Sequence, residues 1–135
     1  MKKIKNLLLV LVVTTFALSG CKKYEDGPSF TLKSAKARMV NDWKLDKVYS
    51  IDGTTDYTLF FSSSSWELDL SSDYSMTQTV DGVTYTGTWA FSDEKDSLKL
   101  TYSGSTFSAY ILKLESNDLW LKDDDDDIQL HFISK

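Results

Sequence analysis

The sequence predicts an all-β fold: an eight-stranded antiparallel up-and-down barrel with a short N-terminal helix. Two observations lead to this prediction. From about residue 41 onward, apolar and polar residues alternate with a period of two, which is typical of strands with one buried face. Turn signals rich in Asp, Gly, Ser and Asn separate these runs, and no connection after residue 71 has room for a crossover helix. Consecutive strands must therefore pair antiparallel, and closing the sheet removes its two free edges.

The first twenty residues have the pattern of a secretion signal. Three lysines precede an apolar run over residues 7–18, which is shorter than the roughly 20 residues that a membrane-spanning helix needs. The run ends in Leu18-Ser19-Gly20-Cys21, and Cys21 is the only cysteine of the sequence. These four residues resemble the lipobox of bacterial lipoproteins, which implies cleavage before Cys21 and acylation of its sulfur. We therefore expect residues 1–20 to be a lipoprotein signal peptide and Cys21 to hold a lipid anchor in the membrane.

The mature chain is expected to be acidic. The 15 lysines and arginines fall to 12 when Lys2, Lys3 and Lys5 are removed, against 20 acidic residues, which gives a net charge of −8. This excess of negative charge argues against nucleic acid and against anionic membrane surfaces as partners. The remaining length suits one domain with its own core.

Residues 21–33 are expected to form the lipidated cysteine and a flexible tether. The stretch is polar, contains the only proline and has no hydrophobic period. Its charges beside Cys21 partly resemble signals that send lipoproteins of the Bacteroidetes to the cell surface, and a tether facing the periplasm explains the same residues. Residues 34–40 predict a short helix that closes one end of the barrel. Ser34 is expected to cap it, and Asn41 to end it in a left-handed turn.

Residues 34–135 make up the predicted barrel domain. In the expected strand over residues 83–91, the odd-numbered residues are apolar or glycine and share one face. The pairs Asp52-Gly53 and Asp81-Gly82 are suited to type I′ hairpin turns. The eight expected strands cover residues 43–51, 66–70, 74–80, 83–91, 98–102, 110–114, 119–121 and 128–132.

Three segments of this domain resemble known families. Asn41-Asp42-Trp43 is similar to the Gly-x-Trp opening of the lipocalin and calycin families, with Asn41 in the place of glycine. Gly87-Thr88-Trp89-Ala90-Phe91 with the following Leu98-Lys99-Leu100, and the final hairpin over residues 119–132, resemble small lipocalin-like lipoproteins of the Bacteroidetes. The resemblance implies a lipocalin-like barrel on a lipid anchor, in a family whose ligands are mostly undefined.

Two functions are open at this point. Large residues on the predicted inner face could line a cavity for a small apolar or aromatic ligand. They could equally fill the barrel, because eight strands enclose an interior just wide enough for side chains. A filled barrel would favour a non-catalytic protein-interaction or scaffolding module in the cell envelope. In both cases we expect lipid anchoring to the outer membrane, at its periplasmic face or at the cell surface. The candidate cavity residues are Trp66, Leu68, Tyr85, Trp89, Leu100, Tyr110 and Leu112.

The sequence offers little for catalysis. His131, the only histidine, alternates with apolar neighbours, so we expect it to face outward or to lie at the barrel rim. No Ser-His-Asp set can be singled out, and we expect neither enzymatic activity nor a cofactor. Residues 123–127 are five consecutive aspartates without the spacing of an EF-hand, which indicates a solvated hairpin tip. Candidates for weak Ca²⁺ binding there are Asp123, Asp125 and Asp127.

Overall fold

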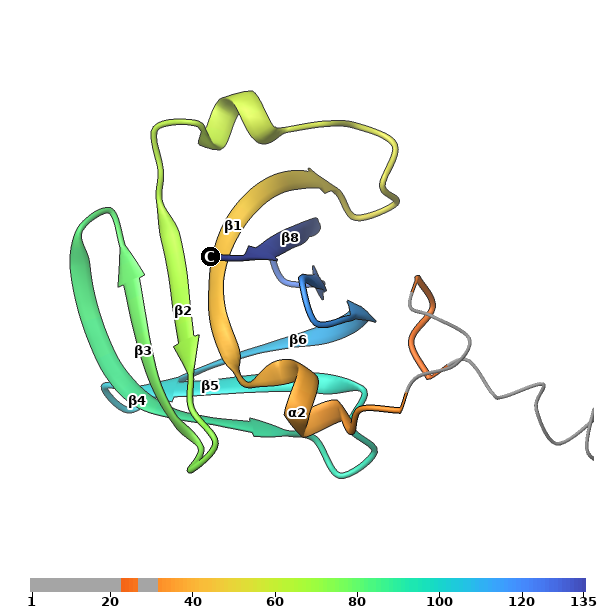
Figure 1. The fold of residues 1–135 in the computed structure, drawn as a ribbon. Coiled ribbons are helices and arrows are strands. Elements are labelled where there is room, and N and C mark those ends of the chain that lie inside the picture. Colours follow the sequence, from red (N-terminus) through yellow and green to blue (C-terminus); the bar gives the residue numbers. More distant parts are fainter. Residues whose placement is uncertain (1–22, 27–31) are drawn as a thin grey trace, which may run out of the picture.

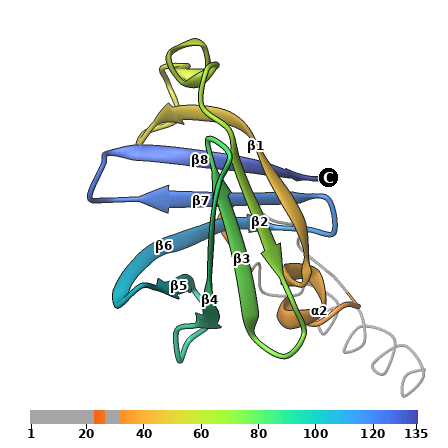
Figure 2. The ribbon, with the colours of Figure 1, turned by 90° about the vertical axis from the view of Figure 1, so that its left-hand side faces the viewer.

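The computed structural model describes residues 23–26 and 32–135, so the expected signal peptide and Cys21 lie outside the described residues. Eight antiparallel strands in the described part of the chain close into a barrel in sequence order (Figure 1). In Figure 2, β2 and β3 run crosswise to β6, β7 and β8, and β1 bends from alongside β2 to alongside β8. The predicted fold class and strand order are confirmed. The strands are β1 (Asn41–Ser50), β2 (Trp66–Leu70), β3 (Ser75–Val80), β4 (Val83–Phe91), β5 (Ser97–Tyr102), β6 (Ser105–Leu114), β7 (Asp118–Asp123) and β8 (Ile128–Ser134).

The helix α2 (Ala35–Met39) lies against one end of the barrel, which we call the closed end (Figure 1). The turns over residues 71–74, 92–96 and 115–117 belong to the same end, because neighbouring strands run in opposite directions. Ser34 caps the helix as predicted, since its Oγ accepts a hydrogen bond from the backbone N–H of Ala37 at 3.1 Å.

The helix ends differently from the prediction. Val40, the residue after the helix, is extended, with φ −66° and ψ 101°. Asn41 is not in a left-handed turn but is the first residue of β1, where it pairs with Leu70. Its side-chain amide donates to the backbone oxygen of Ser116 at 2.9 Å. The ladder and this hydrogen bond together draw Asn41 into the sheet.

Large apolar side chains fill the barrel interior next to the closed end. Trp43 is 0% exposed, and its Nε1 donates to the backbone oxygen of Met39 at 2.9 Å. Trp89 is buried too, and its Nε1 donates to the backbone oxygen of Ser71 at 2.9 Å. Each side chain of this size contributes roughly 1.5–3 kcal/mol by leaving water. Other side chains of this core are Leu68, Leu70, Met76, Leu98, Leu100, Ile111, Leu114, Leu119, Leu121, Leu130 and Phe132.

Gly87 allows β4 and β5 to approach closely. A Cβ atom on Gly87 would lie 2.0 Å from the backbone oxygen of Thr101 on β5. At this distance the two atoms clash, so any residue with a side chain would force one of the strands to move. The glycine in the segment that resembles lipocalin-like lipoproteins is therefore a packing requirement.

The two Asp-Gly pairs behave differently. Asp81 and Gly82 both have positive φ angles, 50° and 81°, as a type I′ turn between β3 and β4 requires. At the other pair only Gly53 has a positive φ, so the prediction of a type I′ turn is wrong there. The reason is that Asp52-Gly53 opens a long connection over residues 51–65 instead of a two-residue hairpin. That connection carries the 3₁₀ helix η1 (Thr58–Phe61).

Residues 23–26 are packed on the barrel, which corrects the prediction of a flexible tether for this stretch. Tyr24 is 3% exposed, and its hydroxyl donates to the backbone oxygen of Lys95 at 3.0 Å. The Arg38 guanidinium lies 5.8 Å from the centre of the Tyr24 ring, and the backbone N–H of Asp26 donates to the oxygen of Leu112 at 2.7 Å. No helix among the described residues is long and apolar enough to span a membrane.

Candidate functional site

The end of the barrel opposite α2, which we call the open end, carries several exposed apolar side chains. It is formed by the connection over residues 51–65 and by the turns over residues 81–82, 103–104 and 124–127. Leu59 and Phe60 of η1 are 86% and 83% exposed. Val83 and Tyr85, at the start of β4, are exposed as well. Exposed apolar side chains at one end of a barrel make that end a candidate surface for a ligand or a partner.

Trp66 forms the floor of the open end. It is the first residue of β2, and its indole ring reaches across the barrel interior. There it makes edge-on contacts with Phe107 of β6, at 5.6 Å between ring centres, and with Phe132 of β8, at 5.4 Å. Beside this floor, the rings of Tyr85 and Tyr102 lie 5.7 Å apart. The open end thus carries a group of aromatic side chains in contact with the packed core.

Two buried polar atoms at the open end lack a hydrogen-bond partner. Among the described residues, Trp66 Nε1 and Gln78 Oε1 are the buried side-chain nitrogen and oxygen atoms without one. Gln78 is 5% exposed. It pairs with Leu68 while Trp66 pairs with Val80, so both side chains belong to the inner face of neighbouring strands. Each unpartnered atom costs roughly 1–3 kcal/mol, and such costs are tolerated mainly where function requires them.

Asp123 lies at the same end, on the inner face of β7. It pairs with Ile128 of β8, is buried, and accepts a hydrogen bond from the backbone N–H of Asp125 at 3.0 Å. Burial raises the pKa of the Asp123 carboxyl, and the neighbouring carboxyls of Asp126 and Asp125 add to that rise. Within the described residues, no group of three or more His, Cys, Asp or Glu side chains is arranged to hold a metal ion. The Asp123 side chain serves to order the hairpin tip that ends at Asp127, whose φ is 54°.

The seven candidate cavity residues fall into separate places. Trp66 and Tyr85 lie at the open end. Leu68, Trp89 and Leu100 face the interior as predicted, but they are packed into the core with at most 2% of their surface exposed. Their role as ligand contacts stays a prediction.

Tyr110 and Leu112 correct the predicted register of β6. Tyr110 is 51% exposed and faces outward, where it pairs with Lys122. The inward positions before it are Phe107 and Ala109. A β-bulge after Ile111 shifts the alternation, so counting back from the buried end of the strand placed Tyr110 on the wrong face. Leu112 is buried at this bulge, apart from the core cluster.

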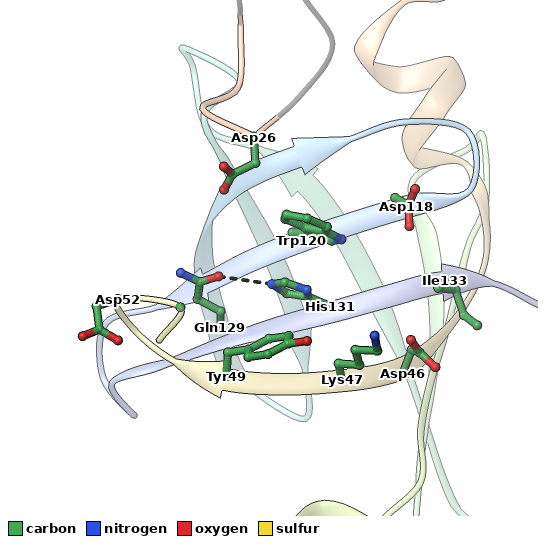
Figure 3. Close-up of a pocket in the computed structure, with 11 residues that line it drawn as sticks. Asp26, Asp46, Lys47, Tyr49, Asp52, Asp118, Trp120, Gln129, His131 and Ile133 are labelled. Atoms are coloured by element: carbon green, nitrogen blue, oxygen red, sulfur yellow. Dashed lines mark hydrogen bonds between the residues drawn. The ribbon is translucent and has the colours of Figure 1, made fainter. Parts of the chain in front are cut away.

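A second site is a groove of about 580 Å³ on the outer wall, over β1, β7 and β8 (Figure 3). Its floor is a row of three rings, with His131 in the middle. The imidazole stacks on Trp120 at 4.1 Å with an angle of 5° between the rings, and it lies 4.8 Å from Tyr49. His131 Nε2 is 3.1 Å from Gln129 Oε1 (Figure 3). His131 therefore faces outward, as the alternation predicted.

The electrostatics of this groove keep His131 neutral. Burial lowers the pKa of the imidazole from 6.5 to about 4, and the positive charges of Lys47 and Lys113 act in the same direction. The carboxylates of Asp26 and Asp118 oppose this shift without cancelling it. The groove is thus a neutral aromatic floor with charged groups at its rim, among them Asp26, Asp46, Lys47, Asp52 and Asp118.

Gln78 and the outer-wall ring row were missed by sequence reasoning. A signal for Gln78 exists, because it occupies an inward position between the apolar Met76 and Val80 in β3. A polar residue in the apolar phase of a strand indicates a buried polar group. The ring row carried no such signal, since it depends on which strands become neighbours in the closed barrel.

Comparisons with known proteins give likenesses in structure. No family model matches the chain, and no curated protein matches it. A lipocalin-like protein from Bacteroides uniformis ATCC 8492 is similar, with a TM-score of 0.54 and 12% identity over 73% of this chain and 99% of that one. A DUF4847 family protein from Bacteroides vulgatus ATCC 8482 has a TM-score of 0.53 and 12% identity, over 73% and 94% of the two chains. Together with the closed eight-stranded barrel, these likenesses show that the chain has a lipocalin-like fold.

Proposed function

We propose that this protein is a lipid-anchored lipoprotein of the cell envelope that binds a small, mostly apolar ligand at the open end of its barrel, without catalysis. The observation that carries the proposal is that two buried polar atoms without a partner, Trp66 Nε1 and Gln78 Oε1, lie at the end of the barrel that also carries exposed apolar side chains. A lipocalin-like fold, whose barrels offer a mouth at one end, agrees with this use.

The binding space in this proposal is shallow. Below Trp66 the interior is occupied by side chains that are almost fully buried, such as Leu100 and Phe132. A ligand would rest on the Trp66 ring, between Tyr85 and Phe107, with η1 beside it. Ligand entry then requires no opening of the closed end.

Titration with an environment-sensitive apolar dye tests the proposal. We expect saturable binding of about one dye per chain, accompanied by quenching of tryptophan fluorescence. The Trp66→Ala variant should weaken dye binding by about tenfold, because it removes the ring on which the proposed ligand rests. Tyr110→Ala is the matched control, since Tyr110 is an aromatic residue on the outer wall. A wild-type protein that binds no dye saturably would contradict the proposal.

The anchor is a separate part of the proposal and rests on the resemblance of residues 18–21 to a lipobox. The Cys21→Ser variant should leave the membrane fraction and lose labelling by radioactive palmitate. Labelled, membrane-bound protein after this substitution would exclude Cys21 as the lipidated residue. Fractionation on a density gradient would then assign the wild-type protein to the inner or the outer membrane.

The outer-wall groove favours a second candidate function, contact with a partner protein in the envelope. Four aspartates and one lysine line the groove, so a partner segment with lysine or arginine side chains fits its charge. A photo-crosslinking residue at position 46 should then give a discrete adduct with one protein in living cells. The same residue at position 110, outside the groove, is the control. Equal labelling from both positions would count against this candidate.

A further inference from the structure

We propose that the ligand of the open end carries a neutral head group of the alcohol or amide class, which hydrogen-bonds to both Trp66 and Gln78. This inference rests on the proposed function and makes its ligand more specific. In this arrangement Trp66 Nε1–H donates to the head group, and the head group donates to Gln78 Oε1. An ionised carboxylate or an ammonium head is rejected.

The two protein atoms come from the same inner face of two paired strands, and the proposal assigns one ligand group to both. Trp66 and Gln78 stand on the paired strands β2 and β3, two positions apart in register and on the same inner face. Both atoms are buried and unpartnered, one a donor and the other an acceptor. A ligand that offers an acceptor and a donor from a single group can satisfy both.

Head groups differ in whether they can both accept a hydrogen bond from Trp66 and donate one to Gln78. A hydroxyl group accepts from an N–H and donates its own proton, and an amide does the same through its oxygen and nitrogen. An ionised carboxylate accepts only, so Gln78 Oε1 would stay buried without a donor. An ammonium group donates only, so the same holds for Trp66 Nε1.

Asp123 adds an electrostatic reason against an anionic head. Its carboxyl is buried on the inner face of the same end, and burial already raises its pKa. A second negative charge nearby would repel it in surroundings of low dielectric constant. A neutral head avoids this cost.

The surroundings require an apolar body behind the head group. Phe107 and Phe132 contact the Trp66 ring from the far side of the barrel. Tyr85 and Tyr102 form a further ring pair at the same end, and Leu59 of η1 at this end is exposed. The ligand class is therefore a small amphiphile with a neutral polar head.

Four probes with the same ten-carbon chain separate the head groups: 1-decanol, decanamide, decanoate and decylamine. They are titrated into the full mature chain at pH 7.5, below their aggregation concentrations, with tryptophan fluorescence and calorimetry as readouts. We expect decanol and decanamide to bind about tenfold or more tightly than the two charged probes, since each charged probe leaves a buried atom unpartnered.

Two variants assign the preference to the named atoms. Gln78→Met keeps a similar volume and removes the acceptor, so decanol should bind about tenfold more weakly while decanoate changes little. Trp66→Phe keeps a ring and removes the N–H, and it should reduce the preference for decanol over decylamine. Thr79→Val, on the outward-facing position next to Gln78, is the control and should leave all four affinities unchanged.

The outcomes distinguish this inference from the proposed function. Equal affinities for decanol and decanoate, or a preference that survives Gln78→Met, would overturn the inference and leave apolar binding at the open end in place. Such a result is expected if a water molecule alone bridges the two atoms. Failure of all four probes to bind would overturn both.

Discussion

At the closed end of the barrel, the indole nitrogens of Trp43 and Trp89 each donate to a backbone oxygen at 2.9 Å. At the open end, the indole nitrogen of Trp66 is buried without a partner. Buried indole nitrogens in this barrel are thus hydrogen-bonded at one end and unpartnered at the other. At the closed end, α2 covers the core and Arg38 donates to the backbone oxygen of Leu114. At the open end, apolar side chains of η1 are left in solvent.

The two ends therefore contribute differently to the stability of the fold. Paired buried polar groups and full burial contribute to the free energy of unfolding, whereas unpartnered buried groups reduce it. The closed end shows that this fold can provide hydrogen-bond partners for buried indole nitrogens, so the missing partner at the open end calls for an explanation. The unsatisfied end is therefore the place where function is to be sought.

The largest expected effect is at the closed end. Trp43→Ala should lower the free energy of unfolding by about 3–5 kcal/mol, because it leaves a cavity and an unpaired carbonyl of Met39. Trp66→Ala should cost clearly less, since the Trp66 ring is partly exposed and loses no hydrogen bond. Urea unfolding of both variants measures the difference. Equal costs would mean that the two ends do not differ in stability.

A more conservative pair isolates the hydrogen bond. Trp43→Phe should cost about 1–3 kcal/mol, because the Met39 oxygen then loses its donor in a buried place. Trp66→Phe removes an N–H that has no partner and should stay within about 0.5 kcal/mol of the wild type. Denaturant midpoints of the two variants check this. A similar loss in Trp66→Phe would show that its N–H is satisfied in solution.

At the open end, removing a polar atom should stabilise the fold. Gln78→Met takes away a buried acceptor without a partner, and we expect the free energy of unfolding to rise by about 1 kcal/mol. The variant should be more stable than the wild type when no ligand is present. A thermal melt detects the change as a higher Tm. A lower Tm would mean that Gln78 is hydrogen-bonded in the free protein.

The last expected effect concerns the outer wall, which belongs to neither end of the barrel. The folded protein holds the pKa of His131 at about 4, whereas the unfolded chain takes up its proton near 6.5. The stability from neutral His131 is therefore complete above pH 6.5 and is lost as the pH falls toward 4. For this half-buried ring we expect about 1 kcal/mol. In His131→Phe, unfolding measured between pH 7 and 4.5 should lack this part of the pH dependence, which Trp66→Phe should retain.

The sequence predicts the barrel well because alternation and turn residues are local signals. Asp81-Gly82 adopts the expected type I′ turn, and Trp89 is buried on the expected face of β4. Tyr110 was misplaced because a bulge changes the phase of a strand without a recognisable residue pattern. Asn41 was misplaced because its ladder partner and the Ser116 carbonyl come from distant parts of the chain.

The candidate site was harder to predict than the fold. Trp66 and Tyr85 were placed on the inner face, yet only the closed barrel brings Trp66 against Phe107 and Phe132. The lack of a partner for Gln78 is likewise a property of the packed interior. Contacts across a barrel depend on its curvature and on strand stagger, which a residue pattern does not contain.

The docking of Tyr24 has a consequence for the lipid anchor that we propose at Cys21. Cys21 precedes Tyr24 by three residues, a span of at most about 11 Å. Tyr24 is held by Lys95 and Arg38, both of which lie at the closed end. With the proposed lipid anchor in place, the closed end would face the bilayer at short range. The open end would then point away from the lipid, and the proposed ligand would be exchanged with the aqueous phase instead of being drawn directly from the membrane.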